Sequence, residues 1–307
     1  MSDVTQLHAD GMSITTGTNF ISKLHNKVLD ERRPEANKLP SPFVVCVTGA
    51  SRGIGAQTAL TFARAGASGL IITARSTTSL ESTIKLCQEA SPSLKITPVA
   101  LEAGSEDQTA SLAETIKTEY GRLDVLINNA GLPSSHESAF APKLTEVRYD
   151  QFQVPMQANY FGRVLTMQAC LPILLSSPGG AKTIINVTSI CSHLVGMGPM
   201  GFNVSELASN RLTEIVAERY KADGVKAFSV HPGEVNTGPG PVGAPAGFTE
   251  ILKDDPDLCG SVCLWLTQGE KSWLSGRYIS SEWDLEELKT RKDEIVNGDK
   301  LKSRLQL

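Results

Sequence analysis

The sequence predicts an α/β fold in which one doubly wound parallel sheet is covered by helices on both faces. Seven short apolar runs, several rich in valine and isoleucine, alternate with helix-length stretches whose apolar residues recur every three or four positions. Continuous apolar runs suit strands buried on both faces, and strand–helix alternation is typical of βαβ units. We therefore expect a single domain built on one seven-stranded sheet.

The predicted elements begin at Phe43 and alternate regularly from there. The expected strands cover residues 43–48, 70–74, 96–101, 125–128, 183–188, 227–230 and 277–279. The expected helices cover residues 56–65, 79–90, 106–120, 154–175, 203–221 and 257–266. Residues 237–247 are rich in glycine and proline and follow a strand, so they form a candidate lid over a ligand crevice.

The two ends of the chain differ from this regular part. Residues 1–42 are polar and finish in a proline-rich break, which predicts an N-terminal extension with one short helix near residues 21–31. Such an extension either packs on the surface or contacts a partner. Residues 284–307 are expected to form a solvated C-terminal helical tail supported by Glu–Lys pairs, so the domain proper spans residues 43–283.

Composition excludes several classes of protein. The 307 residues carry a net charge of -4, which disfavours the basic face of a nucleic-acid-binding protein. No apolar run approaches the ~20 residues of a bilayer span, and the polar, acidic N-terminus is unlike a signal peptide. Six scattered cysteines suit the reduced cytosol, and Cys259 and Cys263 lack the second ligand pair of a metal site. We therefore expect a cytoplasmic protein with a small-molecule substrate and no metal, membrane or nucleic-acid partner.

A glycine motif directly follows the first strand and opens a helix. It reads Thr48-Gly49-Ala50-Ser51-Arg52-Gly53-Ile54-Gly55. Glycines at this spacing permit a tight turn and let backbone amides at the helix N-terminus approach a pyrophosphate. Because the strand–turn–helix context is the one this motif requires, it predicts a dinucleotide site.

Further motifs follow the later strands in a specific order. They are Asn128-Asn129-Ala130-Gly131, Asn159, Val187-Thr188-Ser189 and His231-Pro232-Gly233. Together with the glycine motif they resemble the short-chain dehydrogenase/reductase family over about residues 43–281. The resemblance implies a Rossmann-type sheet with strand order 3-2-1-4-5-6-7. It also implies a homodimer or homotetramer that assembles through the long helices 154–175 and 203–221.

The resemblance assigns cofactor contacts to the glycine loop, the strand ends and the turns after them. These residues are Gly49, Ser51, Arg52, Gly53, Ile54, Gly55, Arg75, Glu102, Asn129, Ala130, Gly131, Glu206, Pro232, Gly233, Val235 and Thr237. Glu102 stands where the family usually carries an aspartate beside the adenine.

The end of the second strand indicates which nicotinamide cofactor binds. An acid there would bind the ribose diol of NAD and repel a 2′-phosphate, but the segment reads Thr73-Ala74-Arg75-Ser76. Arg75 and Arg52 are instead placed to make charge-assisted hydrogen bonds to a 2′-phosphate. We therefore expect NADP(H) as the cofactor.

The catalytic positions implied by the resemblance are only half matched. In ordinary members of the family, a tyrosine exchanges the substrate proton, and a lysine four residues later lowers the pKa of that tyrosine and holds the nicotinamide ribose. A serine positions the substrate carbonyl, and an asparagine supports a water relay. Asn159 and Ser189 match the asparagine and the serine, whereas Phe202 stands at the tyrosine position and Glu206 at the lysine position.

These two replacements predict altered chemistry. Phe202 cannot donate a proton, and general acid–base catalysis contributes ~10²–10⁴-fold. Glu206 would reverse the charge beside the nicotinamide, so a developing alkoxide would be destabilised and ordinary ketone reduction should be poor. A free Glu206 carboxylate could still accept hydrogen bonds from both ribose hydroxyls.

Three functions on a small, largely apolar metabolite fit these residues. The first is hydride transfer from NADPH to an activated acceptor, an iminium ion or a conjugated system, that needs no proton from tyrosine. The second is a non-redox cyclase, isomerase or dehydratase that uses Ser189, His193 and Glu206 and keeps the nucleotide as a structural element. The third is a catalytically silent NADP(H)-binding subunit.

Two histidines and a neighbouring acid are candidates for supporting roles. His193 lies four residues after Ser189 and could replace the lost proton donor. His136 and Glu137 follow the Asn-Asn-Ala-Gly turn and are candidate substrate contacts. The C-terminal tail resembles that of fungal-type members of the family, which suggests specialised metabolism.

Overall fold

A seven-stranded parallel sheet runs through the middle of the molecule in the order β3-β2-β1-β4-β5-β6-β7. The computed structural model describes residues 17–132, 142–196, 198–238 and 248–305. The strands are β1 (Val44–Val47), β2 (Gly69–Ala74), β3 (Lys95–Ala100), β4 (Val125–Asn128), β5 (Thr183–Val187), β6 (Lys226–His231) and β7 (Tyr278–Ser280). The predicted fold class is confirmed, and each predicted strand lies within two residues of the observed one at either end.

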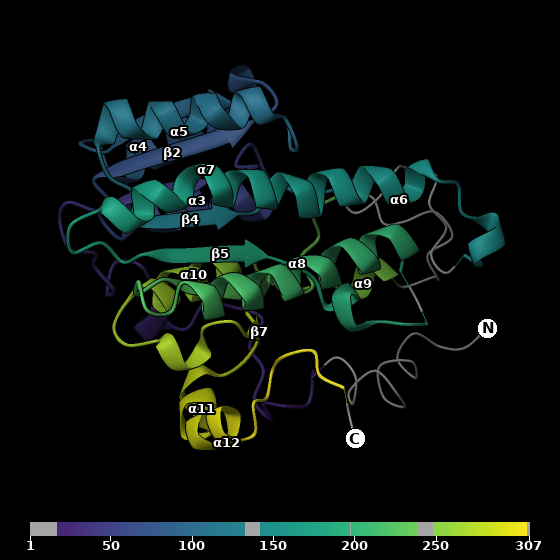
Figure 1. The fold of residues 1–307 in the computed structure, drawn as a ribbon. Coiled ribbons are helices and arrows are strands. Elements are labelled where there is room, and N and C mark those ends of the chain that lie inside the picture. The colour runs from purple at the N-terminus through teal and green to yellow at the C-terminus, as the bar shows by residue number, and fades with distance from the viewer. Residues whose placement is uncertain (1–16, 133–141, 197, 239–247, 306–307) are drawn as a thin grey trace.

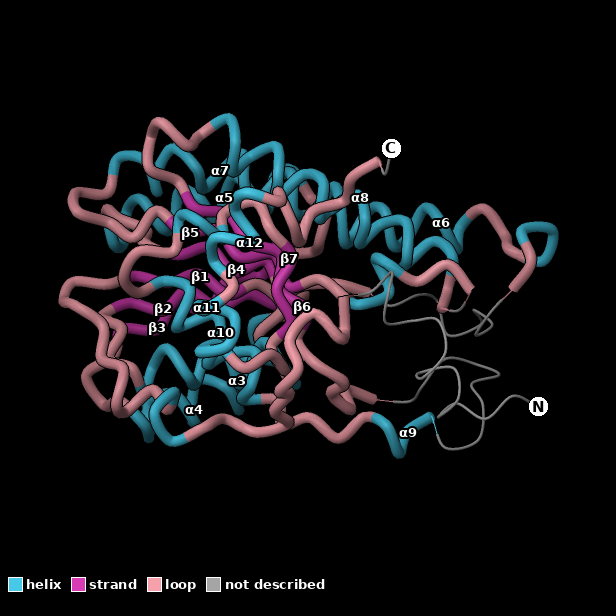
Figure 2. Tube along the Cα trace, turned by 90° about the horizontal axis from the view of Figure 1, so that it is seen from below, coloured by secondary structure: helices cyan, strands magenta, loops and turns pink. Residues whose placement is uncertain are grey.

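Helices cover both faces of the sheet (Figure 2), which explains why every residue of β1, β2, β4 and β5 is buried. On one face lie α3 (Gly53–Arg64), α4 (Glu81–Ala90) and α10 (Asp257–Thr267). On the other lie α5 (Glu106–Tyr120), α7 (Gly162–Ser176) and α8 (Met200–Arg219). Each set of helices packs against its face of the sheet and encloses a separate apolar core.

The predicted helix 154–175 is interrupted near its start. It divides into α6 (Asp150–Pro155), the π-helical segment η4 (Met156–Phe161) and α7. The arrows of Figure 1 point toward the end of the molecule where α6 and α9 (Phe248–Ile251) lie, so the carboxyl ends of the strands meet there. In open α/β sheets this edge is where ligands bind.

The N-terminal extension packs against the C-terminal tail at the β7 edge of the sheet. Leu24 pairs with Trp283 in an antiparallel bridge, and the side chains of Ile21 and Trp283 are buried. The predicted short helix near residues 21–31 is wrong, because the described part of this segment contains only the 3₁₀ turn η1 (Asp30–Arg32). Its backbone is instead bonded to the tail, for example from the His25 amide to the Glu282 carbonyl at 2.7 Å.

The tail forms two short helices, α11 (Leu285–Thr290) and α12 (Lys292–Asn297), beyond β7 (Figure 1). The prediction of a fully solvated tail is wrong for its inner face, where Leu285, Leu288 and Ile295 are buried. Within the described ranges, no helix combines the length and the apolar character that a bilayer crossing requires. His136, Glu137 and most of the candidate lid lie outside the described residues.

Candidate active site

The glycine loop forms a cradle that side chains would fill. Gly49 has a φ of +67°, and a Cβ there would come within 2.7 Å of the Ala130 Cα atom. A Cβ on Gly55 would meet the Gly49 carbonyl oxygen at 2.3 Å. Side chains at Gly49 and Gly55 would therefore not fit in this turn. Glycine at both positions allows the backbone to approach a pyrophosphate closely.

The N-terminus of α3 opens onto this cradle without a cap. Arg52, the N-cap residue, makes no side-chain hydrogen bond to the helix, and the first turn carries no acid. The first amides of a helix lack intrahelical partners and attract anions. This helix end is therefore suited to hold the phosphates of a nucleotide.

A buried threonine ties the end of β4 to the glycine loop. Thr48 Oγ1 accepts hydrogen bonds from the Asn129 and Ala130 amides at 3.1 and 3.0 Å. The Asn129 side chain donates to the carbonyls of Thr48 and Gly49, both at 3.0 Å. The Asn129 side chain thus shapes the cradle through its hydrogen bonds to the protein backbone.

The polar residues just after β2 and β3 are exposed. Arg75 follows β2, is exposed and has no hydrogen bond or ion pair among the described residues. Glu102 is also exposed, just after β3. Arg52 Nη1 donates to the Thr237 carbonyl at 3.0 Å, so one of its donors already links the glycine loop to the segment after β6.

Asn159 lies in the π-helical segment η4 and is fully buried. Its Oδ1 accepts from the Leu132 amide at 2.8 Å, and its Nδ2 donates to the Leu132 carbonyl and to Ser205 Oγ, both at 3.0 Å. Both Nδ2 protons are therefore used. Asn159 connects the turn after β4 to α8 beneath the crevice.

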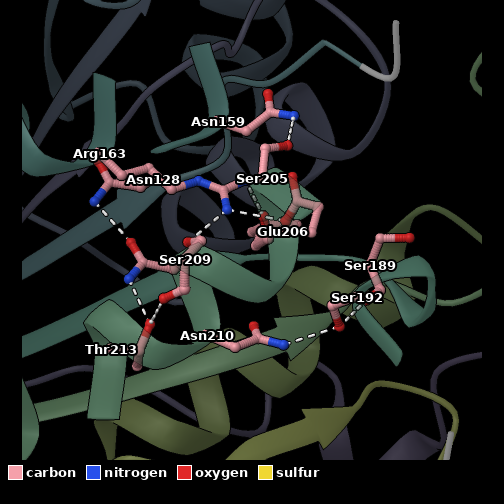
Figure 3. A network of polar contacts seen from close by, with 12 residues as sticks. Asn128, Asn159, Arg163, Ser189, Ser192, Ser205, Glu206, Ser209, Asn210 and Thr213 are labelled. Carbon is pink, nitrogen blue, oxygen red and sulfur yellow. Dashed lines mark hydrogen bonds and ion pairs between the residues drawn. The ribbon is translucent and has the colours of Figure 1, made fainter. Parts of the chain in front are cut away.

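Glu206 forms a buried ion pair with Arg163 of α7 (Figure 3). Arg163 Nη1 donates to Glu206 Oε2 at 2.9 Å, and Nη2 donates to Oε1 at 3.2 Å. Both side chains are 3% exposed. Arg163 also donates to Ser209 Oγ and to the Val187 carbonyl, each at 2.7 Å, so it joins α7, α8 and the end of β5.

This pair corrects the predicted charge of the site. The prediction of an uncompensated negative charge at Glu206 is wrong, because a guanidinium neutralises the carboxylate. Two carboxylate sites are already occupied by Arg163, whereas the predicted ribose contact assumed a free group. Contact between Glu206 and the ribose stays a prediction.

The remaining predicted catalytic residues are separated from one another. Ser189 Oγ accepts from the Cys191 amide at 3.1 Å, which leaves its proton free to donate to a substrate. The His193 ring packs edge-on against Tyr278, with ring centroids 4.8 Å apart, and burial lowers the pKa of His193. It makes no hydrogen bond to Ser189 or Glu206 within the described ranges, so the geometry does not favour the predicted catalytic role. Phe202 opens α8 and is half-buried.

Comparison with known sequences shows to which protein family the chain belongs. A family described as short chain dehydrogenase matches residues 43–240. Short chain dehydrogenase mpl6 of Monascus purpureus is 38% identical over 296 residues, covering 95% of this chain and 98% of that protein. Short chain dehydrogenase pgmD of Aspergillus terreus is 33% identical, covering 94% and 95%. The chain belongs to the short-chain dehydrogenase family.

Solved structures of short-chain dehydrogenases share the fold. A short chain dehydrogenase from Salmonella enterica serovar Typhi aligns with a TM-score of 0.69 at 24% identity, covering 78% of this chain and 96% of that one. A Shigella flexneri protein, described as a short chain dehydrogenase complexed with NADP, aligns with a TM-score of 0.68 at 24% identity and covers 80% and 99%. At this identity the likeness establishes the architecture.

Arg163 is the site residue that the sequence analysis of this short-chain dehydrogenase missed. One signal was present, because Arg163 is the single charged residue in the otherwise apolar or neutral run of α7. It also lies four residues after Asn159, which is one helical turn. A charged side chain in a buried helix requires a partner of opposite charge, and Glu206 was the acid whose cationic partner had not been identified.

The ion pair makes a testable prediction about stability. Arg163→Met would leave Glu206 charged and buried, so we expect a loss of about 3–5 kcal/mol of unfolding free energy by urea titration. The double variant Arg163→Met/Glu206→Met removes both charges and should recover most of that loss.

A control variant is Arg211→Met, which breaks an exposed ion pair with Glu214 and should cost at most about 1 kcal/mol. Equal losses for the single and the double Arg163 variants would contradict the assignment of a coupled buried pair.

Proposed function

We propose that this short-chain dehydrogenase binds NADP(H) and reduces an activated acceptor, an iminium ion or a conjugated system, on a small and largely apolar metabolite. The observation that carries the proposal is the combination of a complete dinucleotide cradle with a crevice whose proton-relay positions hold Phe202 and a neutralised Glu206. The relatives are fungal proteins, which agrees with a role in specialised metabolism.

The residues present fit a phosphorylated dinucleotide. The glycine loop and the uncapped start of α3 would hold the pyrophosphate, and the turn after β6, with Pro232, Gly233 and Val235, would border the nicotinamide. Arg75, which is exposed and has no partner in the part of the chain that the structure describes, would take the 2′-phosphate. When bound, NADPH supplies a hydride at the carboxyl edge of the sheet.

The chain's own groups select the acceptor. Phe202 offers no proton, and the Arg163–Glu206 pair offers no net charge, so neither stabilises the alkoxide of an ordinary ketone. Ser189 can donate one hydrogen bond to orient a substrate oxygen. An acceptor that is already electron-poor needs chiefly this positioning.

The proposal also includes the oligomeric state of the protein and its location in the cell. Phe161 on η4 and Val204 on α8 are each 47% exposed, and Leu207 on α8 is 40% exposed. Exposed apolar groups on these neighbouring helices support a homodimer or homotetramer formed through them. We also keep the cytoplasmic location as part of the proposal, supported by six cysteines that are all free thiols.

The direct test is NADPH oxidation, followed by absorbance, with cyclic iminium ions, enones and simple ketones as acceptors. We expect oxidation that depends on an iminium or conjugated acceptor, with ketone rates at least ~10²-fold lower because no general acid is present. Gly55→Val is the matched negative control, because its side chain would collide with the Gly49 carbonyl.

Two results would contradict this function. Product formation without NADPH consumption would favour the non-redox cyclase, isomerase or dehydratase. Ketones reduced as fast as activated acceptors would show that an ordinary proton donor is present.

A second prediction concerns cofactor choice. Arg75→Ala should weaken NADPH binding by roughly 10–100-fold, the equivalent of one charge-assisted hydrogen bond, and leave NADH binding nearly unchanged. Titration calorimetry measures both, with Arg219→Ala, another exposed arginine, as the control. Equal weakening of the two cofactors would overturn the assignment of the 2′-phosphate to Arg75.

A further inference from the structure

Three carboxyl groups converge at the carboxyl ends of β6 and β7. Glu234 follows β6, Glu282 follows β7, and Asp254 follows α9. The Glu234 amide donates to Asp254 Oδ2 at 2.6 Å, and the Asp254 amide donates back to the Glu234 carbonyl at 3.1 Å. Burial raises the pKa of Glu282, and the carboxylates of Asp254 and Glu234 raise it further, so the three groups lie close together. We call these three residues the carboxyl cluster.

The carboxyl cluster has no cationic partner in the described part of the chain. No lysine or arginine there lies within ion-pair distance of any of its members, and Lys253, next to Asp254, is exposed. Two fully buried acids do have such a partner, since Arg163 pairs with Glu206 and Arg122 with Asp124. An acidic group left without a cation at the ligand edge of the sheet indicates that a ligand supplies it.

The Nε2 atom of a buried histidine faces the carboxyl cluster and has no hydrogen-bond partner among the described residues. His231 is 3% exposed, and its Nδ1 accepts from the Ile190 amide at 3.2 Å. The proton of the neutral ring therefore lies on Nε2, which faces Glu282 Oε2 at 3.6 Å, too far for a hydrogen bond. Burial lowers the pKa of His231 to about 3, so the ring brings no positive charge to the cluster.

The carboxyl cluster lies within electrostatic reach of the catalytic crevice. Glu234 is the residue directly after Gly233 in the turn expected to border the nicotinamide. Its charge, together with that of Glu206, helps to raise the pKa of Cys191, two residues after Ser189. Both acids are therefore within electrostatic reach of Cys191, and among the described residues only Glu206 of the two has a cationic partner.

We propose that Glu234, Asp254 and Glu282 bind an organic cation, a protonated amine or iminium group of the substrate. This inference rests on the proposed function and narrows its substrate to nitrogenous compounds. In this proposal, the carboxyl cluster supplies the negative charge that the sequence led us to expect at Glu206. A metal ion is not the occupant that the geometry suggests, because among the described residues no group of three potential ligands is arranged to hold one.

Proton release would be a signature of this binding. Burial, reinforced by neighbouring carboxylates, raises the pKa of Glu234 and of Glu282 to about 7. The other titratable groups facing the cluster are His231 from β6, Tyr278 from β7, and Cys191 and His193 from the turn after β5. A cation that binds below pH ~7 must displace a proton from the cluster, whereas above that pH the carboxylates are already ionised.

The test uses benzylamine, which is protonated at neutral pH, and benzyl alcohol, its uncharged analogue of similar shape. Titration calorimetry in buffers of different ionisation enthalpy gives affinity and proton release together. We expect benzylamine to bind at least tenfold more tightly than the alcohol, with affinity rising and proton release falling between about pH 6 and pH 8. Glu234→Gln and Glu282→Gln should each abolish this preference, whereas Glu286→Gln, an exposed acid of α11, should leave it intact.

The pH dependence of stability is a second measurement, and it distinguishes loss of the carboxyl cluster from misfolding of a variant. The raised pKa values mean that the folded cluster holds protons that the unfolded chain loses above pH ~4.5, so stability should fall as pH rises from there through about 7. Glutamine at either position should flatten this slope in urea unfolding. A steep slope retained in both variants would contradict the carboxyl cluster.

The remaining outcomes separate this inference from the proposed function. No binding of benzylamine, equal binding of the two compounds, or unchanged binding by the glutamine variants would overturn the cation site. A cation that binds at the cluster in a protein that oxidises no NADPH would leave the site standing and contradict hydride transfer.

Discussion

The buried contact between Arg163 and Glu206 is the constraint on which the rest of the active site depends. It joins α7, α8 and the end of β5 within a few ångströms of the crevice, and each partner would be costly to bury alone. Next to Glu206, Ser205 accepts a hydrogen bond from Asn159, and Asn159 in turn bonds to Leu132 in the turn after β4. One ion pair thus joins three elements of the fold, and its two charges cancel each other.

Cofactor binding and catalysis are separable in this architecture. The nucleotide cradle is built from the glycine loop, the start of α3 and the Thr48–Asn129 tie, none of which uses the relay positions. Residues at the relay positions can therefore change while the cradle is retained. The carboxyl cluster follows β6 and β7 and shares no residue with the Arg163–Glu206 pair, so the acidic groups are separate from the neutral pair.

The sequence predicted what depends on local patterns, and it failed where distant side chains meet. Apolar runs and glycine spacing are local, so the strands and the cradle were predictable, whereas the sheet order came from the family resemblance. Arg163 and Glu206 are 43 residues apart, and only the fold shows that they touch. The same holds for Glu234 and Asp254, and for Phe20 and Trp283, whose rings pack together in an extension expected to contain a helix.

The crystal structure of the complex with NADP(H) tests the central claim most directly. The account predicts that the Glu206 carboxylate keeps both hydrogen bonds to Arg163 when the nucleotide is bound, and that the ring of Phe202 borders the nicotinamide. A Glu206 side chain that leaves Arg163 for the ribose would contradict the neutral pair. A tyrosine hydroxyl and a lysine ammonium found against the nicotinamide would contradict the altered chemistry altogether.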